Sequence, residues 1–199
     1  MNPIFQSSFH IRMTACMSLD GIIASDSLET NSQREKLGYH SKDDYEILKK
    51  DIEWADLIII GAKSLFIEKG AISVTEKKHW LVLSSDPEKT IQNGHYFWKQ
   101  KSLYPHILKY KNKEDLYERI LTFDQGIKNI LVLGGGFIYQ LFWEDFNIQS
   151  LRLTICPGIR GKGISFFPLQ KSFDSLILRE CHLLSHGFCS FLYGFPDPV

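Results

Sequence analysis

The chain has 199 residues, of which 44% are hydrophobic and 23% charged, as in ordinary globular proteins. Its 23 basic residues balance its 23 acidic residues and form no basic run, so charge gives no case for binding to nucleic acid or to a membrane surface. No apolar stretch approaches the roughly 20 residues that a membrane helix needs, and the first ten residues lack the pattern of a signal peptide.

The first half of the chain predicts strands that alternate with helices. A helix is expected to begin at Ser41, because two aspartates in its first turn and two lysines near its end suit the helix dipole. Continuous apolar runs bounded by turn residues indicate buried parallel strands. A flexible tail at 1–10 is expected to precede a strand at 11–17, a turn at 18–21, a short strand at 22–25 and a polar loop at 26–40. The helix from 41 onward is then followed by a strand at 57–60, a short helix at 63–68 and a strand at 79–83.

The second half continues this alternation and ends in paired strands. Residues 151–155 alternate apolar and polar side chains, which predicts a half-exposed or edge strand. Before it, a strand is expected at 103–110, a helix at 113–123, a strand at 130–133 and a helix at 136–146. After it, strands at 182–184 and 188–193 are expected to form a hairpin. The whole pattern predicts an α/β fold with a mixed, mainly parallel central sheet, helices on both faces and an antiparallel C-terminal hairpin.

The most informative motif is a buried strand that runs through three glycines into a helix. Glycines allow positive φ and close approach of a ligand, and a helix begins with free N–H groups that suit a phosphate. The motif therefore predicts a dinucleotide cradle, and a tight turn without a ligand has equal weight. It is not a G-x-G-x-x-G fingerprint, because Tyr139 occupies the place of the third glycine. The predicted cradle consists of Gly134, Gly135, Gly136, Phe137 and Ile138.

Two other strand ends carry polar groups. Gly61, Lys63 and Ser64 offer N–H groups, a cation and a hydroxyl, which together suit a phosphate such as a ribose 2′-phosphate. Ser84 and Ser85 end the next strand. Ligands of open parallel sheets bind at the carboxyl ends of strands, so these groups are expected to share one crevice with the glycines. Taken singly, a strand terminator, a solvated cation and a cap are the simpler interpretations; taken together, the residues favour a ligand.

A substrate side is expected near the first strand. Ser18, Asp20 and Gly21 belong to a turn that follows this strand, and Asp-Gly is a strong turn signal. Asp20 either contacts a substrate or braces the loop. In the next helix, Asp44 and the carboxylates at 43 and 46 are candidates to anchor a substrate, although a solvated helix face is the favoured interpretation.

Cysteines and histidines give no metal-binding pattern. Cys16, Cys156, Cys181 and Cys189 have no C-x-x-C spacing, and the seven histidines show no ligand spacing, so no metal site is expected. Buried, reduced thiols are the favoured interpretation, which predicts a cytoplasmic protein.

Five motifs together carry a family resemblance. They are TACMSLDGIIA at 14–24, ADLIIIGAKS at 55–64, LVLSS at 81–85, LGGGFIY at 133–139 and LRLTICPGIRGKGISFF at 151–167. In this order the chain resembles the dihydrofolate-reductase-like superfamily, with its three-layer fold. It is most similar to the reductase (C-terminal) domain of the bacterial riboflavin-biosynthesis deaminase-reductase.

The resemblance implies a single reductase domain over residues 11–199 that takes a hydride from NADPH. Its substrate would be a small heterocycle, either a ribosylamino-pyrimidine phosphate or a related ring, and a homodimer is common in that branch. It implies that the Gly61 and Ser84 motifs and the glycine run bind the cofactor, and that the Asp20 turn lies beside the substrate.

The substrate half departs from both branches. Riboflavin-type reductases usually have Lys where Ile22 stands and Asp-Asp-Pro after the Gly61 motif, which is absent here. Leu133 before the glycines is more typical of folate reductases, yet their Trp-x-x-Pro loop is missing. The alternatives are a dihydrofolate or pterin reductase and a non-catalytic nucleotide-binding protein on the same fold.

Overall fold

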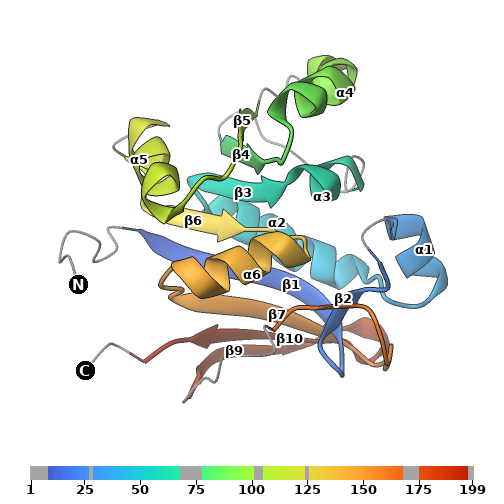
Figure 1. Cartoon of the computed structure of the whole chain (residues 1–199). Helices are drawn as coiled ribbons and strands as arrows, with labels where there is room; N and C mark the ends of the chain where they lie inside the picture. Colours follow the sequence, from blue (N-terminus) through green and yellow to red (C-terminus); the bar gives the residue numbers. More distant parts are fainter. Residues whose placement is uncertain are drawn as a thin grey trace.

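The fold is described from a computed structural model, over residues 9–26, 29–67, 78–100, 105–123, 126–167 and 175–196. Within these residues the central sheet has eight strands in the order β5-β4-β3-β6-β1-β7-β10-β9 (Figure 1). The six strands β5, β4, β3, β6, β1 and β7 are parallel to one another, and β10 is antiparallel to both of its neighbours, β7 and β9. A second, two-stranded sheet pairs β2 with β8.

The elements have the following bounds. The strands are β1 His10–Ser18, β2 Ile22–Ala24, β3 Leu57–Gly61, β4 His79–Leu83, β5 His106–Leu108, β6 Asn129–Val132, β7 Ser150–Cys156, β8 Ile164–Ser165, β9 Ile177–Leu183 and β10 Cys189–Gly194. The helices are α1 Asn31–Lys36, α2 Lys42–Trp54, α3 Ala62–Ile67, α4 Pro87–Gln100, α5 Lys113–Phe123 and α6 Gly136–Asp145, with a 3-10 turn, η2, at Ser185–Gly187.

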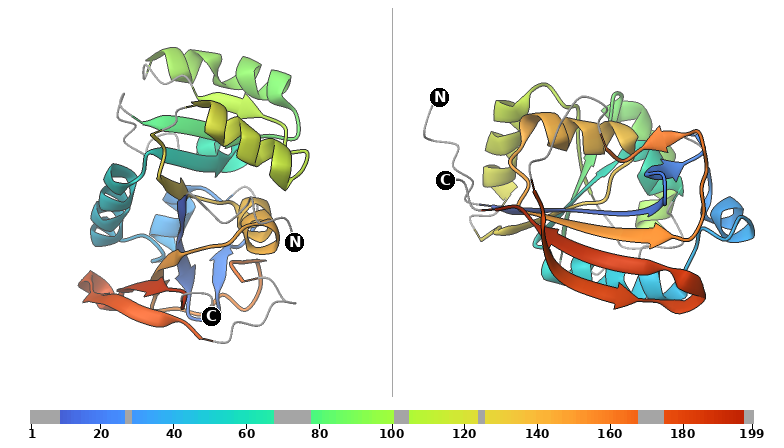
Figure 2. Two further views of the ribbon diagram at one scale, coloured as in Figure 1. Left: turned by 90° about the vertical axis from the view of Figure 1, so that its left-hand side faces the viewer. Right: turned by 90° about the horizontal axis from the view of Figure 1, so that it is seen from below.

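Helices cover both faces of the sheet, which confirms the predicted layers. Helix α2 lies on one side and helices α5 and α6 on the other (Figure 2). Apolar side chains of β3 point alternately to the two sides: Ile58 and Ile60 pack with Leu65 of α3, whereas Leu57 and Ile59 join the cluster under α5 and α6. All four β3 side chains are fully buried, as a continuous apolar run predicts for a central parallel strand.

The predicted edge strand at residues 151–155 is wrong, because β7 lies between β1 and β10. Its polar side chains are buried rather than solvated. Arg152 lies with its Nε 3.5 Å from Asp51 of α2 and its Nη1 2.8 Å from Glu180 of β9. Asp51 also accepts hydrogen bonds from Arg12 and Thr14. A buried ion network thus gives a central strand the polar alternation of an edge strand.

Several other elements differ from the sequence prediction. Helix α1 lies within the predicted loop at 26–40, where Thr30 and Gln33 form a capping box that stabilises this short helix. Helix α4 was not predicted. The predicted tail falls mostly outside the described residues, but Phe9 is buried and β1 already begins at His10. Strand β8 was not predicted either, and β9 begins at Ile177, well before the predicted hairpin strand at 182–184. The antiparallel pairing of the C-terminal hairpin and the other strands and helices agree with expectation.

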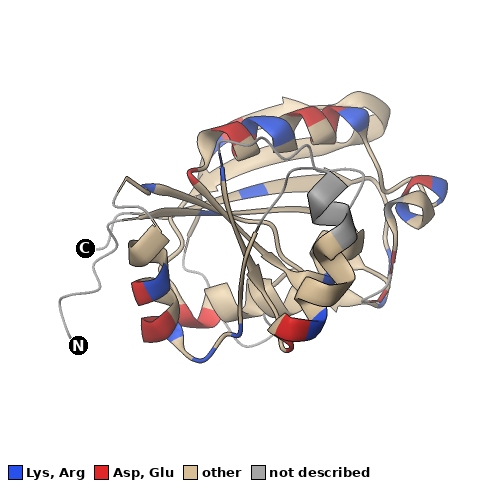
Figure 3. Ribbon diagram, turned by 90° about the horizontal axis from the view of Figure 1, so that it is seen from above, with Lys and Arg blue, Asp and Glu red and all other residues tan. Residues whose placement is uncertain are grey.

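Charges lie mainly on the helices, with both signs interspersed (Figure 3). No described helix has the length and apolar character needed to cross a bilayer. Among the described residues, no group of three His, Cys, Asp or Glu side chains is arranged to hold a metal ion.

Candidate functional site

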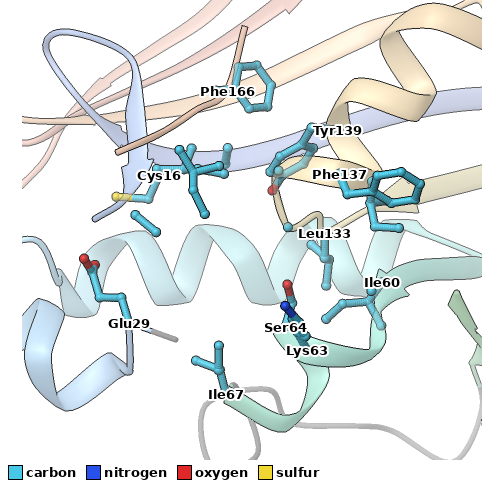
Figure 4. A pocket seen from close by; sticks show the side chains of 18 of the residues that line it. Cys16, Glu29, Ile60, Lys63, Ser64, Ile67, Leu133, Phe137, Tyr139 and Phe166 are labelled. Carbon is cyan, nitrogen blue, oxygen red and sulfur yellow. The ribbon is translucent and has the colours of Figure 1, made fainter. Parts of the chain in front are cut away.

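A cavity of about 1130 Å³ opens at the carboxyl ends of the parallel strands. It extends from the end of β5, past β4, β3 and β6, to β1, and helices α1, α2, α3 and α6 contribute to its walls. Cys16 and Glu29 lie at one end of it, and Lys63, Ser64 and Phe137 lie toward the other (Figure 4). Drug-sized pockets have about 300–1,000 Å³, so this cavity has room for a large ligand or for two ligands side by side.

The glycine turn forms one wall of the cavity. Gly134 and Gly135 have φ of 77° and 62°, and Gly135 combines this with ψ of 159°, a region that only glycine adopts without strain. Gly135 is the N-cap of α6, so the first N–H groups of this helix, which have no intrahelical partner, belong to cavity-lining residues. A Cβ atom on Gly134 would lie 2.1 Å from the ring of Tyr139, whose hydroxyl donates to the carbonyl of Thr14 at 2.6 Å.

The Gly61 motif faces this turn directly. The N–H of Gly61 donates to the carbonyl of Gly134 at 3.0 Å, which joins the ends of β3 and β6. A Cβ atom on Gly135 would lie 2.8 Å from the hydroxyl oxygen of Ser64. Two motifs that are 70 residues apart in the sequence therefore meet across a narrow gap, and the exposed Lys63 lines the same cavity.

The end of β4 completes this half of the cavity. The hydroxyl of Ser84 is within 2.7 Å of the Thr90 hydroxyl and accepts from the N–H of Asp86 at 3.0 Å, so part of its bonding capacity holds the start of α4. Ser85 is exposed and lines the cavity beside Lys109, which follows β5. Hydroxyls, a helix N-terminus and two lysines give this half the character of an anion site.

The opposite half holds a carboxylate. Asp44, in the first turn of α2, lines the cavity together with Arg34 and His40. Burial raises the pKa of Asp44, and a hydrogen bond with Thr154 and the charges of Arg34 and His40 act against that rise. Thr154 is fully buried on β7, so it can fix the orientation of the carboxylate. Asp44 is therefore a half-buried hydrogen-bond acceptor that lines the cavity.

A buried ion pair braces the wall next to Asp44. Glu29 accepts from both terminal nitrogens of Arg160, with a 2.9 Å contact from Nη2, and from the N–H of Ser25 at 2.7 Å. Burial alone would raise the pKa of Glu29, but these bonds outweigh it and lower the pKa to about 2. The Tyr39 ring covers the Arg160 guanidinium at 3.9 Å. These contacts tie the segment before α1 to the loop after β7.

The structure brings together most of the predicted site residues. The cavity is lined by Gly61, Lys63, Ser64, Ser84, Ser85, Gly135, Gly136, Phe137, Ile138 and Asp44. Gly134, Ser18, Asp20 and Gly21 lie outside the lining. Gly134 belongs to the glycine turn but does not line the cavity. The other three residues belong to the tight turn after β1, in which the N–H of Gly21 donates to the carbonyl of Ser18 at 2.9 Å.

Asp20 makes the contacts of a loop brace. One carboxylate oxygen accepts from the Ser18 hydroxyl at 2.5 Å and the other from the N–H of Gly161 at 2.7 Å. The Ser18 bond and the backbone bonds from Arg160 and Gly161 lower the pKa of Asp20 to about 2. Of the two interpretations that the sequence left open, these contacts favour bracing over catalysis.

Asp20→Asn is therefore expected to reduce thermal stability while turnover changes far less than 100-fold, because an amide keeps only one of the two acceptor oxygens. Asp20 contributes stability above its unfolded pKa, and this contribution is lost as pH falls toward 2. Melting curves at pH 7 and pH 3, together with initial rates, would test this. A 100-fold slower enzyme with an unchanged melting temperature would instead assign Asp20 to the chemistry.

Several polar residues of the lining were not predicted as site residues, among them Glu29, Arg34, Lys109 and Tyr139. Arg34 and Glu29 belong to a segment that reads as a polar loop, and only its capping-box pattern, Thr30 with Gln33, could have indicated the helix. Cys16 lies at the same end of the cavity as Glu29 and is half-buried, and burial raises the pKa of its thiol. Cys156 is buried as expected, whereas Cys181 is exposed on β9, contrary to expectation.

Comparisons with known proteins agree with this geometry. The family model of the RibD C-terminal domain matches residues 9–190. A comparison with curated proteins gives no match. Among solved structures, a pyrimidine reductase-like protein from Corynebacterium diphtheriae has a TM-score of 0.66 at 15% identity, over 95% of this chain and 92% of that one.

Two other solved structures are similar. RibD from Acinetobacter baumannii has a TM-score of 0.68 at 12% identity, over 94% of this chain and 57% of that one. A dihydrofolate reductase from Enterococcus faecalis, complexed with NADP(H), has a TM-score of 0.60 at 13% identity, over 94% and 97%. Such low identities show the fold alone, and they confirm the predicted dihydrofolate-reductase-like architecture.

Proposed function

The chain belongs to the RibD C-terminal domain family, and from this membership we propose that it is an NADPH-dependent reductase of the riboflavin-biosynthesis type. Its substrate would be a ribosylamino-pyrimidine phosphate or a related heterocycle. One observation carries the proposal: the turn at Gly135 and the Ser64 hydroxyl face each other within a single large cavity that is also lined by the half-buried carboxylate of Asp44.

The residues of one half fit a dinucleotide. The backbone of Gly135 has a conformation that excludes side chains, and the N-terminus of α6 suits a pyrophosphate. Ser64, Ser85 and Lys63 suit the ribose and its 2′-phosphate. The bound cofactor would supply the hydride. The protein would hold both reactants in a cavity whose wall includes Ile23, Ile164 and Phe166, which limit the access of water.

The other half fits a ring that carries N–H donors. Asp44 forms a hydrogen bond with Thr154 and would accept from a ring N–H and a neighbouring amino group of a substrate. Both 2-amino-4-oxopyrimidines and pterins carry such a pair, so Asp44 supports a pterin reductase as the second candidate. Ile22, which replaces the usual lysine, does not line the cavity; Ile23 and Ala24 do. A protein that binds NADPH but reduces no heterocycle would support the non-catalytic alternative.

Cofactor preference tests the proposal. NADPH is expected to bind about tenfold more tightly than NADH, because a charged hydrogen bond to the 2′-phosphate contributes about 1.5 kcal/mol. Lys63→Ala should reduce the difference in affinity between NADPH and NADH. Lys111→Ala, which changes an exposed lysine outside the cavity lining, should leave that difference unchanged. Titration calorimetry with both cofactors measures each dissociation constant. Equal affinities in the natural protein would contradict the assignment.

A further inference from the structure

The segment that carries helix α1 has little apolar packing to hold it in place. We call residues 29–40 the arm. Helix α1 stands out from the body of the molecule beside β2 (Figure 1). Its described side chains are exposed apart from that of Arg34, which is half-buried, and Leu37, the apolar residue that follows the helix, is 58% exposed. A segment with so few buried apolar contacts opens at low cost in free energy unless other contacts hold it.

The arm nevertheless forms one wall of the large cavity. Glu29, Arg34, Tyr39 and His40 line the cavity, and Glu29 lies at the same end as Cys16 (Figure 4). Among the arm residues whose side chains the structure describes, Glu29 alone is buried. The width of this end of the cavity therefore depends on where the arm lies.

Arg160 fastens the arm through Glu29. It comes from the loop after β7 and does not line the cavity. Both of its terminal nitrogens donate to the Glu29 carboxylate, with Nη2 2.9 Å from Oε1, and Nη1 also donates to the Ser25 hydroxyl at 3.0 Å. The centroid of the Tyr39 ring, at the other end of the arm, lies 3.9 Å from Cζ of Arg160. Arg160 and Glu29 each expose 4% of their side chains, so water has little access to the pair.

The loop that carries Arg160 is itself anchored to the central sheet. Asp20, in the turn after β1, accepts from the N–H of Arg160 at 3.2 Å and from the N–H of Gly161 at 2.7 Å. The N–H of Leu19 donates to the carbonyl of Gly158 at 2.9 Å. Strands β1 and β7 are neighbours inside the parallel part of the sheet. Arg160 therefore connects a firmly held part of the fold to an arm with little packing of its own.

We infer that Arg160 is a positioning residue of the substrate end. Through Glu29 it holds the arm against the cavity, and it thereby sets the affinity for the small molecule that binds there without touching that molecule. This inference rests on the proposed function, because it takes the end with Cys16 and Glu29 as the substrate end. A preformed wall spares the ligand the entropic cost of ordering the arm, so loss of Arg160 weakens ligand binding more than it slows the chemical step.

Steady-state kinetics of Arg160→Met provide the first test, with NADPH and the ribosylamino-pyrimidine phosphate of the proposed reaction as probes. KM for the pyrimidine should rise at least tenfold, whereas kcat and the dissociation constant of NADPH should stay within about threefold. Arg160→Lys should recover part of the affinity, because it keeps a cation but loses the bidentate fork. Lys162→Met is the matched control, since it removes an exposed cation from the same loop outside the cavity lining, and it should change none of the three quantities.

A double variant keeps the test open if Arg160→Met does not fold, because that change leaves the Glu29 carboxylate buried and unpaired. Glu29→Gln combined with Arg160→Met removes both charges. If Arg160 acts through Glu29, KM of the double variant should match that of either single variant within about twofold, since the pair forms one unit. Effects of the two changes that multiply would show that Glu29 acts on the ligand separately, and they would overturn the inference.

Thiol labelling gives a readout that does not depend on the substrate. Cys16 is half-buried at the arm end of the cavity, whereas Cys181 is exposed on β9 and serves as an internal reference. Alkylation by N-ethylmaleimide, followed by peptide mass spectrometry, should be at least tenfold faster at Cys16 in Arg160→Met and in the double variant, and unchanged at Cys181.

An unchanged labelling rate of Cys16 in a folded variant would overturn the inference, as would faster labelling without a change in KM. The proposed function has a separate readout. A natural protein that binds no NADPH would overturn that function, and the labelling rates of Cys16 would still show whether Arg160 holds the arm.

Discussion

Gly135→Val is expected to weaken NADPH binding at least tenfold while the fold persists. The backbone at Gly135 has φ 62° and ψ 159°, where a side chain adds strain of about 1–3 kcal/mol. The new Cβ would also lie 2.8 Å from the Ser64 hydroxyl, inside the gap between the two cofactor motifs. Relief of either conflict would move backbone N–H groups away from the proposed pyrophosphate site. Calorimetry gives the affinity, and circular dichroism reports the fold.

A control must separate backbone strain from loss of the cradle. Gly38 has a comparable φ of 75° with no atom within 4 Å of its ideal Cβ, and it does not line the cavity. Gly38→Val should therefore lower stability but leave NADPH affinity within about twofold. A folded Gly135→Val protein with unchanged affinity would show that the glycine turn is only a turn.

The cofactor half could be predicted because its signals are local. A run such as residues 57–60 indicates a buried strand by itself, and the glycines after residue 133 mark a strand end. Parallel strands then bring their carboxyl ends to one edge, which predicted that Gly61 and Gly135 share one crevice, and the structure adds that their strands, β3 and β6, are neighbours. The hydrogen bond between the ends of β3 and β6 shows that the two motifs are in contact.

The substrate half could not be predicted in the same way, because its contacts join distant segments. Nothing near Glu29 in the sequence indicates a pair with Arg160, 131 residues away. The same holds for Arg152, whose partner Asp51 lies on another element and turns an edge-like pattern into a buried strand. Asp20 is the single carboxylate of its turn, which makes it the catalytic candidate there, but its oxygens accept from N–H groups of the loop after β7.

Asp44→Asn is expected to lower kcat/KM about 100-fold, in line with the loss of a charged hydrogen-bond acceptor for the substrate. The protein should nevertheless be no less stable at pH 7. Burial raises the pKa of Asp44 above its ordinary value of 3.8, so its contribution to folding is fully present below that pH and is lost as pH rises through the raised pKa. The amide of the Asp44→Asn variant carries no charge, so burying it costs no ionic desolvation. Its free energy of unfolding therefore does not fall as pH rises through that pKa.

The neighbouring carboxylate makes a sharp comparison. Asp43 lies in the same turn of α2 but accepts from the N–H of Ser185 at 2.8 Å, outside the cavity lining. Asp43→Asn should keep kcat/KM within about twofold. Urea unfolding between pH 4 and pH 8 measures the free energy of unfolding. The fall in this free energy that the raised pKa of Asp44 causes should be seen in the natural protein and in Asp43→Asn, and it should be absent in Asp44→Asn. A change at Asp44 that leaves kcat/KM intact would remove this residue from the substrate site, whereas lost activity with retained stability would place it there.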